Sequence, residues 1–177
     1  KLAEALPARV ATTPRGKGLF SEANPLSLGV FGFAGHRPAR EALLGADVDL
    51  IFTVGASLNE TTTFNWNPAL ARHRTLVQLD IDVDRIGRNY PVDVPLVGDA
   101  ETVLHELGHA LRRALRGKPA ASQWTGEAAP DGLFDGAAAR GSEAVPLRPE
   151  RWRAELDAAL PENALVFSDI GGHMLFN

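Results

Sequence analysis

Two acidic residues, Asp80 and Asp82, stand at the end of an apolar run over residues 76–81. Carboxylates at the tip of a strand in a parallel sheet can accept hydrogen bonds from the hydroxyl groups of a ribose. They can equally cap a short helix that follows, because a side-chain oxygen accepts hydrogen bonds from its first free N–H groups. The sequence leaves nucleotide binding and helix capping open for both residues.

A glycine-rich segment, GVFGFAG at residues 29–35, precedes a helical pattern. Glycines there allow the backbone to approach a phosphate or a flavin edge near a helix N-terminus. The same glycines would also suit a structural turn. If the segment binds a ligand, Gly32 and Gly35 are the candidate residues, together with Ser57 at the tip of another apolar run. Lys17, between two glycines, is expected to be a solvated turn residue.

Residues 105–109 read HELGH, which matches the H-E-x-x-H pattern of zinc peptidases. In those enzymes two histidines one helical turn apart bind the metal, and the glutamate acts as general base. The surrounding pattern argues against such a site, because His105 and His109 fall on the charged side of the expected helix, opposite its apolar stripe. A catalytic zinc also needs a third protein ligand and an enclosed cavity. We expect a solvated helix face, with a zinc peptidase as the alternative.

The elements that must position these residues are short strands alternating with helices. Apolar runs that stop at glycine or acidic residues predict buried parallel strands. The pattern predicts strands at 9–12, 48–54, 76–81, 94–97 and 164–167, and helices at 2–6, 36–44, 68–73, 100–116 and 149–160. Gly45 is expected to close the second helix, and Asp99 to cap the start of the fourth. In such a sheet, ligands bind outside the carboxyl ends of the strands.

This order predicts an α/β fold, with a doubly wound, Rossmann-like parallel sheet and flanking helices. We expect this domain at residues 1–116. A linker at 117–147 follows, where alanine, glycine, proline and serine dominate and periodicity is lost. Residues 148–177 would begin a second, incomplete α/β element. The chain is therefore expected to be a piece of a longer polypeptide.

Composition excludes several classes of function. The 177 residues carry a net charge of −4 and form no basic stripe with interleaved aromatic residues, so no nucleic-acid partner is expected. There is no cysteine, which excludes disulfides and thiolate chemistry. No apolar run approaches the ~20 residues that span a bilayer, so no membrane partner is expected. The default location is cytoplasmic.

Four motifs, in this order and spacing, resemble the central domain of thiamine-diphosphate-dependent enzymes. That family includes acetolactate synthases, benzoylformate decarboxylases, pyruvate oxidases and oxalyl-CoA decarboxylases. The motifs are TTPRGKG at 12–18, the Gly-x-x-Leu at 55–58, the Asp-Ile-Asp at 80–82 and the Gly-Asp-Ala at 98–100. The resemblance covers residues 6–115, and the tail at 169–173 is similar to the opening of the cofactor-binding domain.

The resemblance implies a parent enzyme that decarboxylates a 2-oxo acid with thiamine diphosphate and Mg²⁺, as a homodimer or homotetramer. It places the activating glutamate and the metal-holding segment outside these residues, so the chain alone would be inactive. Gly171, Gly172 and His173 match a loop that contacts the diphosphate. Positions around a nucleotide site for FAD or ADP match the residues Gly32, Gly35, Asp80, Asp82 and Asp99. The alternative to an enzyme is a non-catalytic nucleotide-binding or structural domain.

Overall fold

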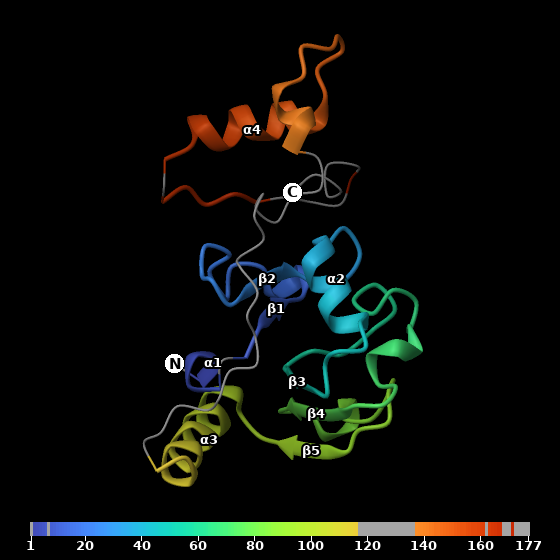
Figure 1. Ribbon diagram of the computed structural model, residues 1–177, viewed down its shortest axis with the longest axis vertical. Helices are drawn as coiled ribbons and strands as arrows, with labels where there is room; N and C mark the ends of the chain where they lie inside the picture. Colours follow the sequence, from blue (N-terminus) through green and yellow to red (C-terminus); the bar gives the residue numbers. More distant parts are fainter. Residues whose placement is uncertain (1, 7, 117–136, 162, 168–170, 172–177) are drawn as a thin grey trace.

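The strands of the computed structural model form two parallel sheets (Figure 1). The structure describes residues 2–6, 8–116, 137–161, 163–167 and 171. Strands β1 (Val10–Thr12) and β2 (Ser27–Val30) make one sheet, and β3 (Leu50–Val54), β4 (Thr75–Asp80) and β5 (Val94–Val97) make the other in the order β3-β4-β5. The predicted α/β class, with parallel strands and flanking helices, is confirmed.

The strand β2 includes Gly29 and Val30, where the sequence predicted only a glycine loop. The loop prediction was therefore wrong at these two residues. All four residues of β2 are buried. Its pairing with β1 contains an irregularity, since Val10 is opposite Ser27 whereas Ala11 is opposite Gly29. Gly29 has a φ of +77° and donates its N–H to the Ser27 hydroxyl at 3.0 Å. A glycine inside a short strand commonly marks such a bulge, and it masked the strand in the sequence.

The helix α2 (Arg37–Leu44) follows the glycine loop as predicted, with Pro38 in its first turn. Gly45 is its C-cap and donates its N–H to the Glu41 carbonyl oxygen at 2.8 Å. The φ of Gly45 is −71°, so the helix ends without the left-handed residue that a glycine cap often supplies. Helix α2 packs against β2 and against the 3₁₀ helix η2 (Pro68–Leu70).

The strands β3, β4 and β5 agree with the predicted ranges to within one or two residues at each end. Their register is regular, with Leu50 opposite Thr75 and Val77 opposite Val94. One element predicted beside them differs: the expected helix at 68–73 is the single turn η2. After β4 the chain forms a further single turn, η3 (Val83–Arg85).

One core joins the two sheets. Ile51 of β3 and Leu76 of β4 are buried in the same cluster as Leu28 of β2 and Ala39 of α2. Ala11 of β1 is partly buried and packs against this cluster. The full buried cluster consists of Leu28, Phe31, Ala39, Ile51, Leu58, Leu70, Leu76 and Tyr90. Both sheets therefore contribute residues to one shared core.

The helix α3 (Ala100–Ala114) begins at the predicted cap and ends two residues before the predicted end. The Asp99 side chain accepts the Thr102 N–H at 2.9 Å. The predicted apolar side of α3 is half-buried at Leu104, Leu107 and Leu111, and no residue of this helix is fully buried. Among the described residues, no helix is both long and apolar enough to cross a membrane.

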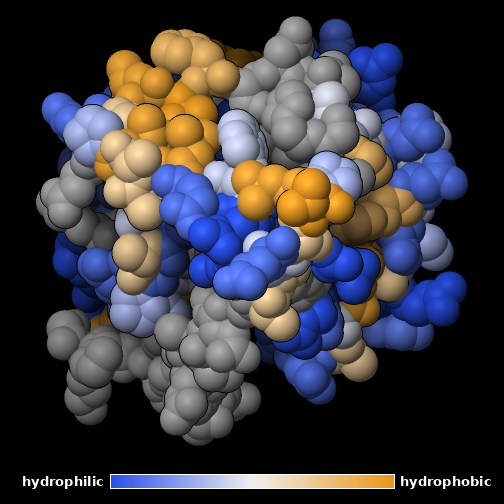
Figure 2. Space-filling view, turned by 90° about the horizontal axis from the view of Figure 1, so that it is seen from above, coloured by the Kyte–Doolittle hydropathy of each residue, from blue (hydrophilic) through white to orange (hydrophobic). Residues whose placement is uncertain are grey.

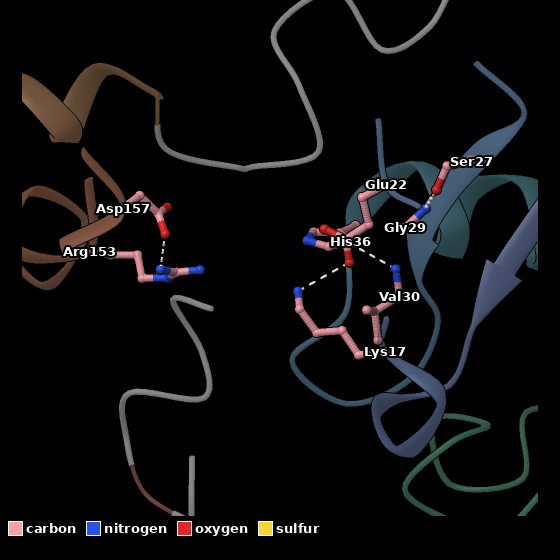
Figure 3. Close-up of polar contacts among 8 residues, drawn as sticks. All are labelled: Lys17, Glu22, Ser27, Gly29, Val30, His36, Arg153 and Asp157. Atoms are coloured by element: carbon pink, nitrogen blue, oxygen red, sulfur yellow. Dashed lines mark hydrogen bonds and ion pairs between the residues drawn. The ribbon is translucent and has the colours of Figure 1, made fainter. Parts of the chain in front are cut away.

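After the range 117–136, which lies outside the described residues, the chain forms η4 (Ala137–Gly141) and α4 (Pro149–Ala159). These two helices pack on each other, and Arg151 of α4 donates to the Ser142 carbonyl oxygen at 3.4 Å. A further ion pair within α4 joins Arg153 and Asp157 (Figure 3). The helix prediction for 149–160 is confirmed, while the domain boundaries at 116 and 147 stay predictions.

The predicted strand at residues 164–167 is wrong. These described residues are irregular, and the side chains of Leu165 and Phe167 are 85% and 92% exposed. Trp152 of α4 is half exposed as well. Figure 2 shows that hydrophobic residues, coloured orange, lie exposed among hydrophilic ones on one face of the molecule. An apolar run becomes a strand only where a neighbour pairs with it, and no described segment does so here.

Candidate functional site

The carboxyl ends of β2 and β3 lie together, because the loops that follow them are hydrogen-bonded. Phe33, after β2, donates its N–H to the Thr61 carbonyl oxygen, after β3, at 2.8 Å. The ring of Phe31 meets the ring of Phe64 edge-on, with centroids 5.4 Å apart. The predicted site residues of these two loops therefore share one edge of the fold, as the parallel-sheet argument requires.

The two glycines of this loop make close approaches to the protein's own backbone. Gly32 has a φ of +123°, and a Cβ there would lie 3.0 Å from Cα of Thr62. A Cβ on Gly35 would lie 2.4 Å from the Val30 carbonyl oxygen. Both positions thus require glycine for the turn itself. The structural role that the sequence left open is filled at Gly32 and Gly35, while a ligand role for them stays a prediction.

His36, which the sequence reading did not single out, holds this loop closed. Its ring nitrogen Nδ1 accepts the Val30 N–H at 2.8 Å, and its own backbone N–H donates to the Val30 carbonyl oxygen at 2.7 Å (Figure 3). The side chain is buried at this point. Because Nδ1 accepts, the proton of a neutral His36 ring lies on Nε2. A histidine that directly precedes a helix with proline in its first turn was the available signal.

Lys17, predicted to be solvated, forms an ion pair with Glu22 whose N–O distance is 3.1 Å (Figure 3). The lysine side chain is 40% exposed and the glutamate side chain 29%. A pair at this exposure contributes little to stability. The ammonium group of Lys17 therefore has an anionic partner, Glu22, within the chain.

Asp80 and Asp82, equivalent in the sequence argument, differ in the structure. Asp80 is only 5% exposed; its Oδ1 accepts the Asp82 N–H at 3.0 Å, and its Oδ2 has no hydrogen-bond partner among the described residues. Asp82 is exposed, accepts the Asp84 N–H at 3.0 Å as the cap of η3, and lies 3.3 Å from Arg85. Of the two residues, Asp82 therefore caps the helix, while Asp80 has a buried acceptor oxygen without a donor among the described residues.

Gln78, also missed by the sequence reading, ties the loops at this edge together. Its side chain is buried, its Oε1 accepts the Gly87 N–H at 3.0 Å, and its Nε2 donates to the carbonyl oxygens of Ala56 and Arg85 at 3.4 and 3.3 Å. A polar residue inside an apolar strand was the available signal, because buried amides are normally hydrogen-bonded.

The remaining predicted residues lie near this edge or outside the described part of the chain. Ser57 is half-buried, and its carbonyl oxygen accepts the Asn89 side-chain N–H at 2.9 Å. Asp99 caps α3, and the hydrogen bonds it accepts from Thr102 lower the pKa of its carboxyl group. The preceding N–H, of Gly98, donates to the Asp80 carbonyl oxygen at 3.0 Å. Gly171 is exposed, while Gly172 and His173 lie outside the described residues.

The two histidines of HELGH, His105 and His109, lie on the exposed side of α3, as expected. The rings of His105 and His109 meet edge-on with centroids 4.5 Å apart, and Nδ1 of His109 lies 3.1 Å from Nη2 of Arg112. Within the described ranges, no group of three or more His, Asp or Glu side chains is placed to hold a metal ion. The third ligand of a zinc site is therefore missing from this part of the chain.

A family model described as "Thiamine pyrophosphate enzyme, central domain" matches residues 1–107, more than half of the chain. The chain belongs to the thiamine pyrophosphate enzymes. The resemblance inferred from the four motifs is confirmed, and residues 1–107 are the family's central domain. The candidate site residues of this domain lie at or after the carboxyl ends of its strands: Gly32, Gly35, Ser57, Asp80 and Asp99.

Curated relatives of this thiamine pyrophosphate enzyme chain extend the match toward its C-terminus. A probable acetolactate synthase large subunit of Methanococcus aeolicus is 29% identical over 188 aligned residues, covering 99% of this chain and 31% of that protein. A sulfoacetaldehyde acetyltransferase of Rhodobacter capsulatus is 32% identical, covering 97% of this chain and 32% of that protein. The chain thus spans about a third of the length of these relatives.

The solved structure of a benzoylformate decarboxylase from Polynucleobacter necessarius shares the fold of the chain. It superposes with a TM-score of 0.63 at 23% identity, covering 92% of this chain and 28% of that one. At this identity the similarity supports the architecture of the chain rather than its substrate.

Proposed function

We propose that this chain is part of a thiamine-diphosphate-dependent enzyme that decarboxylates a 2-oxo acid and transfers the product, in the manner of an acetolactate synthase. The observation that carries the proposal is the extent of the similarity: 99% of the chain aligns with the Methanococcus aeolicus protein, including the tail beyond the central domain. In this reading the central domain serves as a scaffold, and Gly171, Gly172 and His173 approach the diphosphate.

Only a small part of the proposed thiamine diphosphate site lies within residues 1–177. When bound, thiamine diphosphate supplies the carbanion chemistry that protein side chains lack. Of the three tail residues, the structure describes only Gly171, which is exposed. The described residues contain no acidic cluster for the Mg²⁺ ion. We propose that other segments of a full-length enzyme, which like its relatives would be about three times as long as this chain, supply activation and metal binding, and that this enzyme is a homodimer or homotetramer.

The chain on its own is expected to release no carbon dioxide from pyruvate or benzoylformate with thiamine diphosphate and Mg²⁺. A cofactor held on one side only cannot be oriented against its substrate, and orientation accounts for much of the rate. The measurement is carbon dioxide release above a blank without protein, with an authentic acetolactate synthase as the positive control. Clear turnover by the purified chain would show that its catalytic groups lie within residues 1–177.

A second function, binding of an adenine nucleotide such as ADP or the ADP part of FAD, is favoured by one specific feature. Within the described part of the chain, the buried Oδ2 atom of Asp80 has no hydrogen-bond donor, and a ribose hydroxyl group would supply one. The surrounding residues fit a nucleotide only in part. The backbone of Thr61 and Thr62 lies against Gly32, where the ligand would have to approach. Calorimetric titration with ADP and FAD tests this site, with Asp80 as the residue whose replacement matters.

A further inference from the structure

The HELGH segment of α3 has no part in the proposed function, yet it carries two side chains that bind metals in many proteins. His105 and His109 stand four residues apart, so their side chains lie one turn apart on the same face of the helix. Both residues are exposed, and α3 lies at the outside of the molecule (Figure 1). Imidazole nitrogens are suitable ligands for Cu²⁺, Ni²⁺ and Zn²⁺. The two rings are therefore accessible to a dissolved metal ion.

The separation of the two rings matches that of a chelate. A metal about 2.0–2.1 Å from an imidazole nitrogen lies about 3.2 Å from the centre of that ring. Two rings on adjacent positions of an octahedral or square-planar metal then have centroids about 4.5 Å apart. The centroids of His105 and His109 are 4.5 Å apart, with the rings edge-on to each other. Rotation of the rings, without movement of the backbone, therefore suffices to bring one nitrogen of each to a shared metal.

The helix holds the two histidines at this separation. The pair lies well inside α3 (Ala100–Ala114), whose start is fixed by the Asp99 cap. Gly108 weakens the helix between the rings, because glycine has the greatest backbone freedom. Two ligands on one helix make the second metal bond an intramolecular step, which raises the affinity of the pair above that of either ring. A metal bound to both rings would also stabilise the helix across Gly108.

Arg112 competes with a metal for His109. Its Nη2 lies 3.1 Å from Nδ1 of His109, and because a guanidinium group can only donate, Nδ1 accepts this hydrogen bond. A metal on Nδ1 would displace Arg112 directly. A metal on Nε2 would move the ring proton to Nδ1, which could then no longer accept. Metal binding therefore breaks the Arg112 contact in either case, whereas Glu101, one turn before His105, contributes a favourable negative charge.

We propose that His105 and His109 form a two-ligand site for a divalent transition metal, with higher affinity for Cu²⁺ than for Ni²⁺ or Zn²⁺ and with water in the remaining positions. The site differs from that of a zinc peptidase, since it has no third protein ligand within the described residues and is open to solvent. It binds its metal reversibly, and it depends on neither of the functions proposed above.

Calorimetric titration of the untagged 177-residue chain with Ni²⁺ and with Cu²⁺ tests the site. His105→Gln and His109→Gln are each expected to lower the affinity about 100-fold, because a single ligand remains and the chelate is lost. Glutamine favours a helix at least as well as histidine, so circular dichroism should show α3 preserved. Arg112→Gln is expected to raise the affinity about fivefold, because it removes a competing donor and a nearby positive charge.

His73→Gln is the matched control, because His73 is exposed and has no other histidine within a helical turn of it in the sequence. Its affinity for both metals should stay within about twofold of that of the unchanged chain. Equal affinities for the unchanged chain and the two HELGH variants would overturn the proposal by placing the metal elsewhere. A loss in only one of these variants would overturn it by showing a single ligand, and a lower affinity in Arg112→Gln would contradict the competition at His109.

Discussion

Replacing Gly35 with alanine is expected to destabilise the central domain by about 3 kcal/mol, since a rigid contact would be overpacked. The added Cβ would lie 2.4 Å from the Val30 carbonyl oxygen and 2.8 Å from the Gly32 carbonyl oxygen. Both contacts are to backbone, which cannot move aside as a flexible side chain does. The Val30 carbonyl also accepts the His36 N–H, so the turn before α2 would be displaced.

Thermal unfolding followed by circular dichroism measures this effect. A loss of this size corresponds to a fall in melting temperature of more than about 10 °C for a domain of this length. Gly108→Ala is the matched control, because it adds the same atom inside α3, 3.7 Å from Arg112 and clear of the backbone. That variant should be stabilised by about 0.5–1 kcal/mol through helix propensity. Equal melting temperatures for Gly35→Ala and the unchanged chain would contradict the geometry of the loop.

Replacing Asp80 with asparagine is expected to weaken ADP binding about tenfold or more. Hydrogen bonds to a charged group contribute about 1.5–3 kcal/mol, and each 1.4 kcal/mol is tenfold in affinity. Asparagine keeps the oxygen that accepts the Asp82 N–H, so the turn after β4 is preserved while the free acceptor is lost. Calorimetric titration of both proteins with ADP measures the difference.

Asp82→Asn is the matched control for this titration. Asp82 is exposed and caps η3, and asparagine caps equally well, so the affinity for ADP should stay within about twofold. A second control replaces ADP with its 2′,3′-dideoxy analogue, which should bind the unchanged protein and Asp80→Asn with similar affinity. ADP binding that is indifferent to both substitutions would place the nucleotide elsewhere.

The sequence predicts the second sheet well, because its signals are local. The runs that become β3, β4 and β5 are apolar and end at glycine or acidic residues, and Asp99 marks the start of α3 by a capping contact within one turn. The strand β2 was missed because Gly29 and the bulge opposite Val10 are set by pairing with β1. The run at 164–167 has a strand-like pattern, but a strand also needs a partner that the described chain does not provide.

The candidate site shows the same division between local and long-range signals. Residue type and position correctly placed Asp80 and Asp82 at a strand end, yet only burial separates the free acceptor from the helix cap. Gln78 and His36 act through contacts with loops that come from other parts of the chain. Spacing in the sequence carries no information on which carbonyl or amide groups such side chains meet.

Carbon dioxide release by the complete gene product that contains this chain is the most direct test of the proposed function. With pyruvate or benzoylformate as substrate, turnover is expected only when thiamine diphosphate and Mg²⁺ are both present, and it should be lost after dialysis against a chelator and restored by adding both back. A complete protein that binds thiamine diphosphate but decarboxylates neither 2-oxo acid, or turnover that persists without the cofactor, would contradict the account.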